Sequence, residues 1–354
     1  MSVRHRTTRG GRTRFRAAVP VLITMSLASL SGAQLVSADP PPTARTMTAD
    51  QARASGTAVG VRRHAESAGE VLELQMPAAI VGTSGVGLPA NERARRDAAR
   101  FLGTSRNGAI AIADGIGDPH AGIAVTSADG SQAHTTLSGV AGAAFAADGS
   151  WLAAVDAVGR LWRIDAHTGA PMQLAAGPYT GSVHFTRAGD LLLVEAASGD
   201  SIFPSAVVRF NPATRRATVV DKEEGFVFSA TELADGSVAV TAHVFGGGVA
   251  VRRVTDGSSD LLASLGSNAI DPSLSSDGSR IAYSAGGAVY LHDVGSGSTR
   301  GIGQGEMPRI AADGGSLLVL RDGRTALLAA DGAELDRFAA AAVGWGSCGE
   351  GCRP

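Results

Sequence analysis

The stretch Leu274–Gly297, LSSDGSRIAYSAGGAVYLHDVGSG, decides the fold. It contains an Asp-Gly turn, a short apolar run, a glycine-rich break and a second apolar run that ends at Asp293. An Asp-Gly pair beside apolar runs is a typical signal of a β-hairpin, and runs this short favour strands over helices. The segment therefore predicts paired strands, and similar turns elsewhere in the chain show how often the pair recurs.

Tight turns like Asp277-Gly278 recur at intervals of 36 to 45 residues, at Asp148-Gly149, Gly189-Asp190, Asp235-Gly236 and Asp313-Gly314. A second turn follows each of them after 17 to 21 residues, at Asp165, Asn211, Asp256, Val294 and Asp331. Asn107-Gly108 and Asp129-Gly130 supply one earlier pair of turns. Two series in phase indicate a structural repeat of about 40 residues. The six units are residues 97–137, 141–175, 182–221, 227–263, 269–301 and 306–338.

Each unit has the order strand a, tight turn, strand b, loop, strand c, tight turn, strand d. Antiparallel four-stranded units of about 40 residues are typical of the blades of a β-propeller. A solenoid of parallel coils would have a shorter period, and a two-sheet sandwich would not repeat. The sequence therefore predicts an all-β chain that forms a single β-propeller.

Two of the units resemble known families. The run Asp271–Tyr283, DPSLSSDGSRIAY, with Val289–Asp293, VYLHD, resembles the repeat of TolB-type propellers. The run Phe145–Ala153, followed by Leu161–Asp165, is similar to a WD40 repeat. The resemblance covers residues 97–345 and implies a propeller architecture. It implies no catalytic residue, because such motifs set turns and packing.

Closing the ring requires residues outside the six units. Val343–Trp345 falls about one period after Ile310–Ala312, where strand a of another blade would begin. Upstream, residues 57–63, 71–76 and 79–83 have the composition of strands. Together these segments would build a seventh, composite blade and leave no open sheet edge. The sequence favours seven blades over the alternative of six, with the propeller spanning residues 57–354.

The N-terminus has the three parts of a secretory signal peptide. Six arginines precede an apolar stretch from Ala17 to Val36, and small residues for cleavage follow at 36–38. We expect cleavage after Ala38, which makes the mature protein secreted and without a membrane span. An uncleaved membrane anchor is the alternative. Residues 39–56 are predicted to be a flexible linker, in which residues 48–51 can cap a short helix.

Removal of the signal peptide makes the protein more acidic. Six of its 31 basic residues are lost and all 33 acidic residues remain, so the formal net charge changes from −2 to −8. Lys222 is the only lysine. Such a chain is poorly suited to a phosphate backbone, which excludes nucleic acid as a partner. We expect a monomer.

No reaction signature is complete. Gly85–Ala90 has the glycine spacing of a dinucleotide site, but no acidic residue follows about 20 positions later. Gly82–Val86 begins like a nucleophile elbow and has valine where the last glycine is required. His120, His184 and His243 would be metal ligands only if the channel brought them together. We predict no cofactor, no metal and no catalytic residue.

Cys348 and Cys352 are the only cysteines. In an exported protein they are predicted to form a disulfide, with two free thiols as the alternative. So small a ring contributes only about 2 kcal/mol by the chain-entropy rule. We therefore expect the bond to stiffen the tail without holding the propeller closed.

The four-stranded units predict two unlike faces of the ring. The a–b and c–d turns on one face are short, whereas the b–c and d–a loops on the other are longer and varied. Binding sites are common on irregular loops held by a rigid scaffold. The candidate ligand-binding residues on these loops are Asp118, His120, Tyr179, Glu195, Asp200, Phe203, Glu223, Glu224, His243, Phe245 and Glu306.

Two functions fit this pattern. The leading hypothesis is a secreted, non-enzymatic propeller that binds a protein or cell-envelope ligand through its b–c and d–a loops. Acidic loop residues favour cationic partners, and aromatic residues provide apolar anchors. The alternative is an extracellular propeller hydrolase or lyase acting on a sugar or lactone, with or without a metal at the channel mouth.

Overall fold

The computed structural model describes residues 42–55, 58–66, 69–76, 90–114, 122–137, 139–196, 205–223, 225–340 and 343–345. Residues 41–354 cluster as one compact unit, and every element named below belongs to it. The predicted signal peptide and the pair Cys348 and Cys352 lie outside the described residues. Among these residues, no helix is long and apolar enough to cross a membrane.

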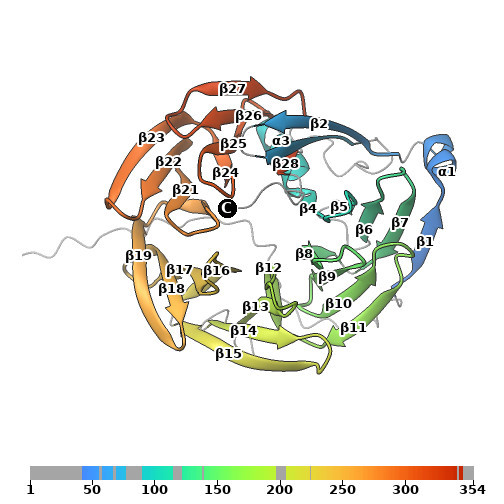
Figure 1. The fold of residues 1–354 in the computed structure, drawn as a ribbon, viewed down its shortest axis with the longest axis horizontal. Helices are drawn as coiled ribbons and strands as arrows, with labels where there is room; N and C mark the ends of the chain where they lie inside the picture. The colour runs from blue at the N-terminus through green and yellow to red at the C-terminus, as the bar shows by residue number, and fades with distance from the viewer. Residues whose placement is uncertain are drawn as a thin grey trace, which may run out of the picture. The chain divides into compact units, whose positions relative to one another are not determined.

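Seven antiparallel sheets follow one another around a ring (Figure 1). We number them as blades 1 to 7 in the order of their innermost strands, β4, β8, β12, β16, β20, β24 and β28. Five blades have four strands, blade 1 has five and blade 7 has three. The all-β propeller and its seven blades are therefore confirmed.

The strands of the first three blades are as follows. Blade 1 contains β4 (Phe101–Thr104), β5 (Ile110–Asp114), β6 (Gly122–Thr126) and β7 (Gln132–Thr136), with β1 (Ala44–Met47) outside β7. Blade 2 contains β8 (Val140–Phe145), β9 (Trp151–Asp156), β10 (Leu161–Asp165) and β11 (Pro171–Ala175). Blade 3 contains β12 (Tyr179–Phe185), β13 (Leu191–Ala196), β14 (Ser205–Asn211) and β15 (Arg216–Glu223).

The other four blades continue the ring. Blade 4 contains β16 (Phe226–Glu232), β17 (Val238–Val244), β18 (Gly248–Thr255) and β19 (Ser258–Gly266). Blade 5 contains β20 (Ile270–Leu274), β21 (Arg280–Ala285), β22 (Ala288–Asp293) and β23 (Ser298–Gln304). Blade 6 contains β24 (Glu306–Ile310), β25 (Ser316–Arg321), β26 (Arg324–Ala329) and β27 (Glu334–Arg337). Blade 7 contains β28 (Val343–Trp345), β3 (Gly69–Gln75) and β2 (Gly60–Glu66).

Strand b of a blade is buried on both of its faces, because each face packs against a neighbouring blade. In β25, for example, the five residues from Ser316 to Leu320 are all buried. The outermost strand β27 is exposed along its whole length. This gradient explains why the second strand of each unit is a nearly continuous apolar run instead of an alternating one.

Apolar clusters join every pair of neighbouring blades, so the ring has no gap in its core. In order around the ring, contacting clusters contain Ile123 with Leu152, Leu161 with Leu193, Val207 with Val240, Val251 with Ile281, Leu291 with Val319, Leu318 with Val71, and Leu72 with Ile112. All of these side chains are buried. Burial of apolar surface between blades is therefore the main force that holds the ring together.

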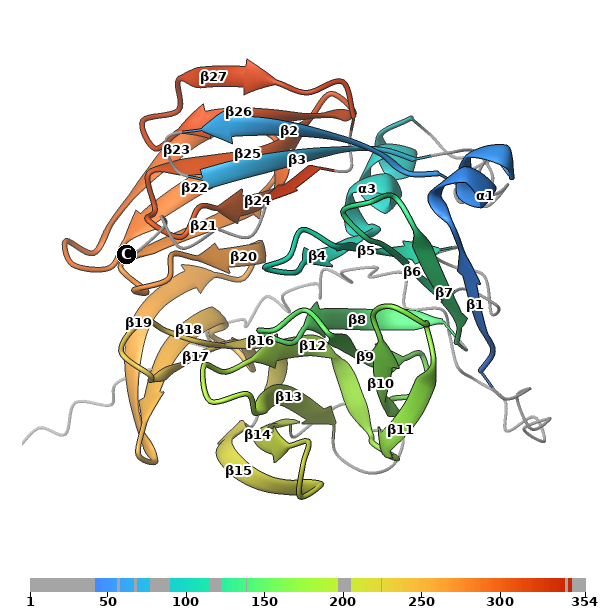
Figure 2. The same cartoon turned by 45° about the vertical axis from the view of Figure 1, so that its right-hand side comes forward.

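Blade 7 joins the two ends of the propeller. The C-terminal strand β28 pairs with β3, so Val343 lies opposite Glu73. The indole Nε1 of Trp345 donates to the carbonyl of Arg309 at 2.9 Å, which ties β28 to blade 6. Figure 2 shows β2 and β3 beside β25 and β26. The third upstream run, residues 79–83, lies outside the described residues.

The N-terminal segment differs from the predicted flexible linker. β1 pairs with β7 as a fifth strand of blade 1, and α1 (Ala49–Ala54) follows it. Thr48 and Gln51 form a capping box at the start of α1, as the sequence predicts for this short helix. The outer edge of β7 has backbone groups that seek partners, so an adjacent extended segment can satisfy them. The helix α3 spans Ala90–Ala99.

The two faces of the ring are defined by hydrogen bonds between its turns. On one face, which we call the turn face, the c–d turn of blade 2 bonds to its a–b turn, from the Ala166 N–H to the Ser150 carbonyl at 3.0 Å. On the other, the loop face, the Tyr179 N–H at the start of blade 3 donates to the Gly159 carbonyl in the b–c loop of blade 2 at 2.9 Å. Each strand a therefore begins at the loop face and ends at the turn face.

Carboxylates close the turns of the turn face. Asp148 accepts hydrogen bonds from the backbone N–H and the hydroxyl of Ser150, and these bonds lower its pKa. At Asp235 the hydroxyl and the N–H of Ser237 have the same effect on the pKa. Hydrogen bonds lower the pKa of Asp129 and Asp293 as well. The aspartate that recurs in these turns thus stabilises each turn through local hydrogen bonds.

The lowered pKa values of these turn aspartates predict that acid destabilises the protein. A carboxylate whose folded pKa is lowered contributes stability that is present above its unfolded pKa near 3.9 and is lost as the pH falls through the folded pKa. We expect the melting temperature to fall between about pH 4 and pH 2. Asp148→Asn combined with Asp235→Asn should make this dependence shallower. A melting temperature that does not change over this range would contradict the role of the turn carboxylates.

Candidate ligand-binding site at the loop face

The innermost strands carry bulges near the loop face. The pairing of strand a with strand b shifts register in each of blades 1 to 6. In blades 5 and 6 the bulge contains the pairs Asp271-Pro272 and Met307-Pro308, and the residues before proline have φ of 51° and 50°. Proline cannot donate to the ladder, and a bulge re-aims the neighbouring side chains. Both bulges lie at the loop-face end of the channel.

A charged cluster surrounds these two bulges. The Arg95 Nε on α3 lies 3.2 Å from a Glu306 carboxylate oxygen. Arg309 donates to the Ala98 carbonyl at 3.0 Å and to the Val343 carbonyl at 3.3 Å. Burial lowers the pKa of Arg309, and the nearby Asp271 carboxylate opposes that shift. The cluster thus joins blades 5, 6 and 7 and the helix α3.

Asp271 is the least compensated member of this cluster. Asp271 is an exposed residue, and partial desolvation of its carboxylate raises its pKa. Arg95 and Arg309 counteract the shift, and Glu306 adds to it. Within the described part of the chain its carboxylate has no hydrogen-bond partner. A perturbed carboxyl group on a backbone with positive φ is a common feature of functional sites.

Blades 3 and 4 contribute aromatic groups to the same face. Tyr179 lies opposite Glu195 in the sheet, and its pKa is raised by desolvation and then by the Glu195 charge. Phe226 lies opposite His243, and its ring makes an edge contact with Phe228 at 5.1 Å. A groove of about 470 Å³ runs between β12 and β16. The site therefore has an aromatic side on blades 3 and 4 and a charged side on blades 5 and 6.

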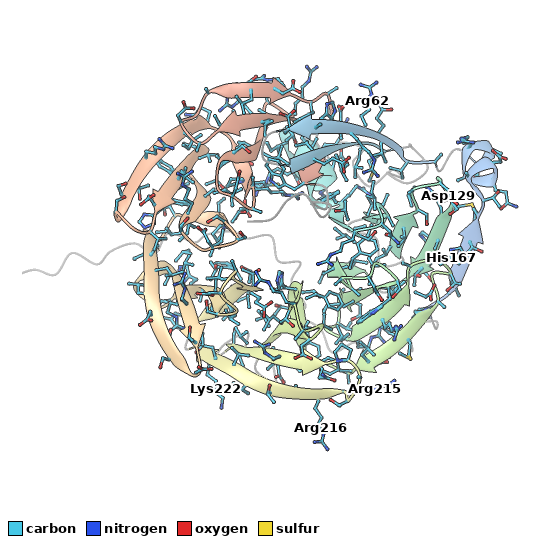
Figure 3. The ribbon with its side chains drawn as sticks, viewed as in Figure 1. Arg62, Asp129, His167, Arg215, Arg216 and Lys222 are labelled. Atoms are coloured by element: carbon cyan, nitrogen blue, oxygen red, sulfur yellow. The ribbon has the colours of Figure 1, made fainter. Side chains whose placement is uncertain are left out.

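Phe245 lies at the tip of the b–c turn of blade 4. Its side chain is 65% exposed, and Val244 beside it is 36% exposed. A large apolar side chain at a loop tip is a typical anchor for a protein partner. Lys222 is on the outermost strand of blade 3, β15, and points away from the ring (Figure 3).

The structure describes about half of the predicted candidates. It brings together Tyr179 with Glu195, and it places His243 two residues before Phe245. Glu306 contacts Arg95. Glu223 is the last residue of β15 and pairs with Ser205. Five candidates lie outside the described residues, namely Asp118, His120, Asp200, Phe203 and Glu224.

His184 makes contacts within the protein. Its ring nitrogens lie 3.2 and 3.4 Å from the Thr231 hydroxyl of the next blade, and desolvation lowers its pKa. His243 is on β17, a different strand of the blade that contains Thr231. Across the described ranges there is no group of three or more His, Cys, Asp or Glu that could hold a metal ion.

Three residues of the site escaped sequence reasoning. They are Asp271, Arg309 and Arg95. The signal that could have found the first two is the proline that follows Asp271 and Met307 at the same place in two repeats. No local sequence feature identifies Arg95, because its partner Glu306 lies far away in the sequence.

The comparisons with known proteins agree with the fold. No family model and no curated protein matches the sequence. TolB from Acinetobacter baumannii is 20% identical, with 84% of each chain covered and a TM-score of 0.51. An oligogalacturonate lyase in complex with manganese is 12% identical, with 82% of this chain and 85% of that chain covered and a TM-score of 0.54. The tricorn protease is 11% identical, with 77% and 33% covered and a TM-score of 0.51.

At these identities the likeness shows a shared fold alone. The chain is a seven-bladed β-propeller, and its predicted resemblance to TolB-type propellers is confirmed.

Proposed function

We propose that this protein is exported and that its propeller binds a protein or cell-envelope ligand at the loop face. The observation that carries the proposal is Asp271, an exposed carboxylate with a raised pKa and no hydrogen-bond partner in the described part of the chain, held by a bulge at the channel mouth. Export is supported by the arginine-rich, apolar N-terminus with small residues at 36–38.

The chemistry of the site favours a cationic group on the partner. An ammonium or guanidinium donor would replace the solvent around the exposed Asp271 carboxylate with charge-assisted hydrogen bonds, which are the stronger kind. Phe245 would anchor an apolar side chain of the same partner at the rim. We infer a basic, partly apolar segment of a protein as the ligand.

Variants of this face test the proposal. A partner is first captured from the culture medium on immobilised mature protein and identified by mass spectrometry, and its affinity is then measured by calorimetry. Asp271→Asn and, separately, Phe245→Ala should each weaken binding about tenfold, which is about 1.4 kcal/mol. Asparagine is nearly isosteric with aspartate and tolerates positive φ, so the bulge should persist.

The matched control is on the turn face. Asp277→Ala removes the carboxylate that accepts from the Ser279 N–H at 2.9 Å, so it should lower the melting temperature and leave affinity unchanged. Affinity that falls in Asp277→Ala and not in the loop-face variants would contradict the proposed site.

A second candidate function is acid–base catalysis on an acidic sugar. It is favoured by the raised pKa of Asp271 and by the fold likeness to the oligogalacturonate lyase. The test is release of unsaturated products from oligogalacturonate in the presence of Mn²⁺. Activity that disappears in Asp271→Asn would establish this alternative, and no turnover by the wild type would eliminate lyase activity on this substrate.

A further inference from the structure

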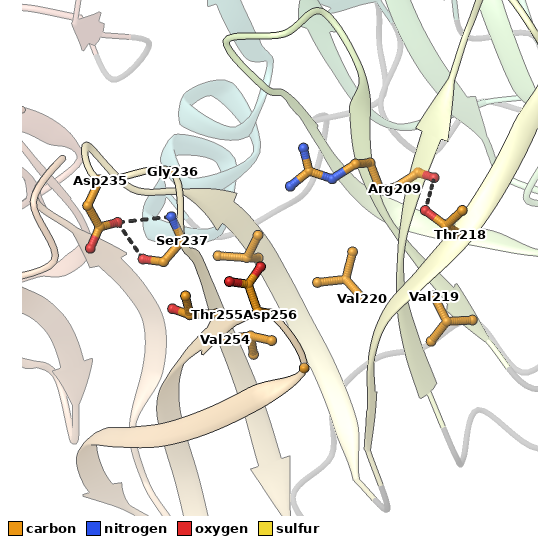
Figure 4. Close-up of a pocket in the computed structure, with 12 residues that line it drawn as sticks. Arg209, Thr218, Val219, Val220, Asp235, Gly236, Ser237, Val254, Thr255 and Asp256 are labelled. Atoms are coloured by element: carbon orange, nitrogen blue, oxygen red, sulfur yellow. Dashed lines mark hydrogen bonds between the residues drawn. The ribbon is translucent and has the colours of Figure 1, made fainter.

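A second groove lies between blades 3 and 4 at the turn face, away from the loop-face site. Its volume is about 520 Å³, which is within the range of ligand pockets. One wall comes from β14 and β15 of blade 3. The other comes from the two tight turns of blade 4, which contain Asp235 and Asp256 (Figure 4).

The side chain of Arg209 points into this groove because of strand alternation. Side chains two residues apart in a strand share a face, and Val207 is fully buried against blade 4. Arg209 therefore also faces blade 4, where Figure 4 shows its side chain at the groove. It is half-buried, and its guanidinium makes no hydrogen bond or ion pair with any residue that the structure describes.

The equivalent arginine of blade 2 shows which contact Arg209 lacks. Arg163 occupies the same register position in blade 2, and its guanidinium lies 4.9 Å from the centre of the Trp151 ring. In blade 3 the position of Trp151 is taken by Asp190, which accepts a hydrogen bond from the Asn211 amide at 2.8 Å. Arg209 thus lacks the aromatic ring that contacts the guanidinium of its counterpart Arg163.

The opposite wall carries negative charge over an apolar floor. Asp256 has φ of 48° in a two-residue turn with Gly257, and within the described ranges its carboxylate has no partner. Asp235 accepts from Ser237 and lies 3.8 Å from Arg253. Val254 is buried at the base of the groove, and Val219 is 55% exposed at its rim.

We propose that this groove binds an extended peptide segment of a protein partner that carries an acidic, an aliphatic and a basic side chain at alternate positions, so that all three face the groove. The acidic group would pair with Arg209, the basic group with Asp256, and the aliphatic group would cover the valines. Charge complementarity of this kind fixes the direction of the peptide as well as its place. Arginine is well suited to hold a carboxylate with two parallel hydrogen bonds.

The probe is a pool of acetylated and amidated pentapeptides with Asp or Glu at position one, Val or Leu at position three, and Lys or Arg at position five, because these positions share a face of an extended chain. The control pool has Gln at positions one and five. Binding is followed by NMR on ¹⁵N-labelled mature protein, through the amide shifts of Val220 and Gly257. We expect the charged pool to shift these amides and the neutral pool to leave them in place.

Two variants complete the test. Arg209→Gln should weaken binding of the charged pool about tenfold, whereas Arg163→Gln, the equivalent change in blade 2, should leave it unchanged. Equal binding of the two pools, no shift with either pool, or no effect of Arg209→Gln would overturn the proposal. Phe245→Ala should not affect these shifts, so failure at this groove is distinguishable from failure of the loop-face site.

Discussion

Asp156→Ala is expected to lower the free energy of unfolding by about 3 to 5 kcal/mol, the usual cost of breaking a buried, hydrogen-bonded ion pair. The Asp156 side chain is almost fully buried at the end of β9. One of its oxygens accepts from the backbone N–H groups of Val158 and Arg160 at 3.1 and 2.9 Å. The other accepts from Arg160 Nε at 2.6 Å and from Trp162 Nε1 at 2.8 Å.

Alanine would remove the acceptor of all four bonds at once. The buried indole N–H of Trp162 would then have lost its partner, and an unsatisfied buried donor costs more than a hydrogen bond normally contributes. Urea unfolding gives the free energy directly. Asp148→Ala is the matched control, because it removes an exposed turn carboxylate of the same blade and should cost much less. Equal unfolding midpoints for the two variants would contradict the stabilising role of Asp156.

Ending the chain after Ala342 is expected to destabilise the propeller by about 4 kcal/mol or more. This change removes β28, and with it the buried Val343 and the half-buried Trp345, at about 2 kcal/mol for each apolar side chain. It also exposes the inner edge of β3 and removes the carbonyl of Val343 that accepts from Arg309. An unpaired inner edge should additionally promote aggregation.

The control for ring closure is a chain that ends after Gly346. It keeps β28 and lacks both cysteines, so its melting temperature should be close to that of the full protein. The chain that ends after Gly346 could instead have the same low melting temperature as the chain that ends after Ala342. In that case the tail and its predicted disulfide hold the ring closed, and β28 does not have the role assigned to it.

The sequence reveals the propeller because its signals are local. A tight hairpin turn needs residues that accept positive φ, and an Asp-Gly pair such as Asp277-Gly278 marks it in most units. Strands b are buried between two blades, so runs such as Ser316–Leu320 are nearly all apolar. The seventh blade follows from a general rule, since a ring with an open edge would be exposed to aggregation.

The pairing of β1 with β7 has no comparable signal. The four residues from Ala44 to Met47 are mostly exposed, and neighbouring prolines suggest an extended linker. The free edge of β7, about 90 residues later in the chain, determines where this segment lies. The neighbouring Thr43 makes hydrogen bonds with that edge. Composition can describe such a segment as extended, but it cannot name the edge that the segment meets.

The candidate site was only partly predictable for the same reason. Tyr179, Glu195 and Phe245 were predicted as candidates because loops between strands are visible in the repeat. Asp271 sits inside the most regular repeat of the chain, where its position resembles a purely structural motif. Its perturbed pKa depends on groups from blade 6 and α3 that only the closed ring brings near.

The most direct test of the central claim compares capture of the partner by three immobilised proteins in one experiment. Wild-type mature protein, Asp271→Asn and Asp277→Ala are exposed to the same culture medium, and bound proteins are quantified by mass spectrometry. We predict one or more proteins that bind the wild type and Asp277→Ala equally and are depleted about tenfold on Asp271→Asn, a difference of about 1.4 kcal/mol. Equal capture by Asp271→Asn, or loss of capture only in Asp277→Ala, would show that the loop-face mouth of the channel is not the binding site.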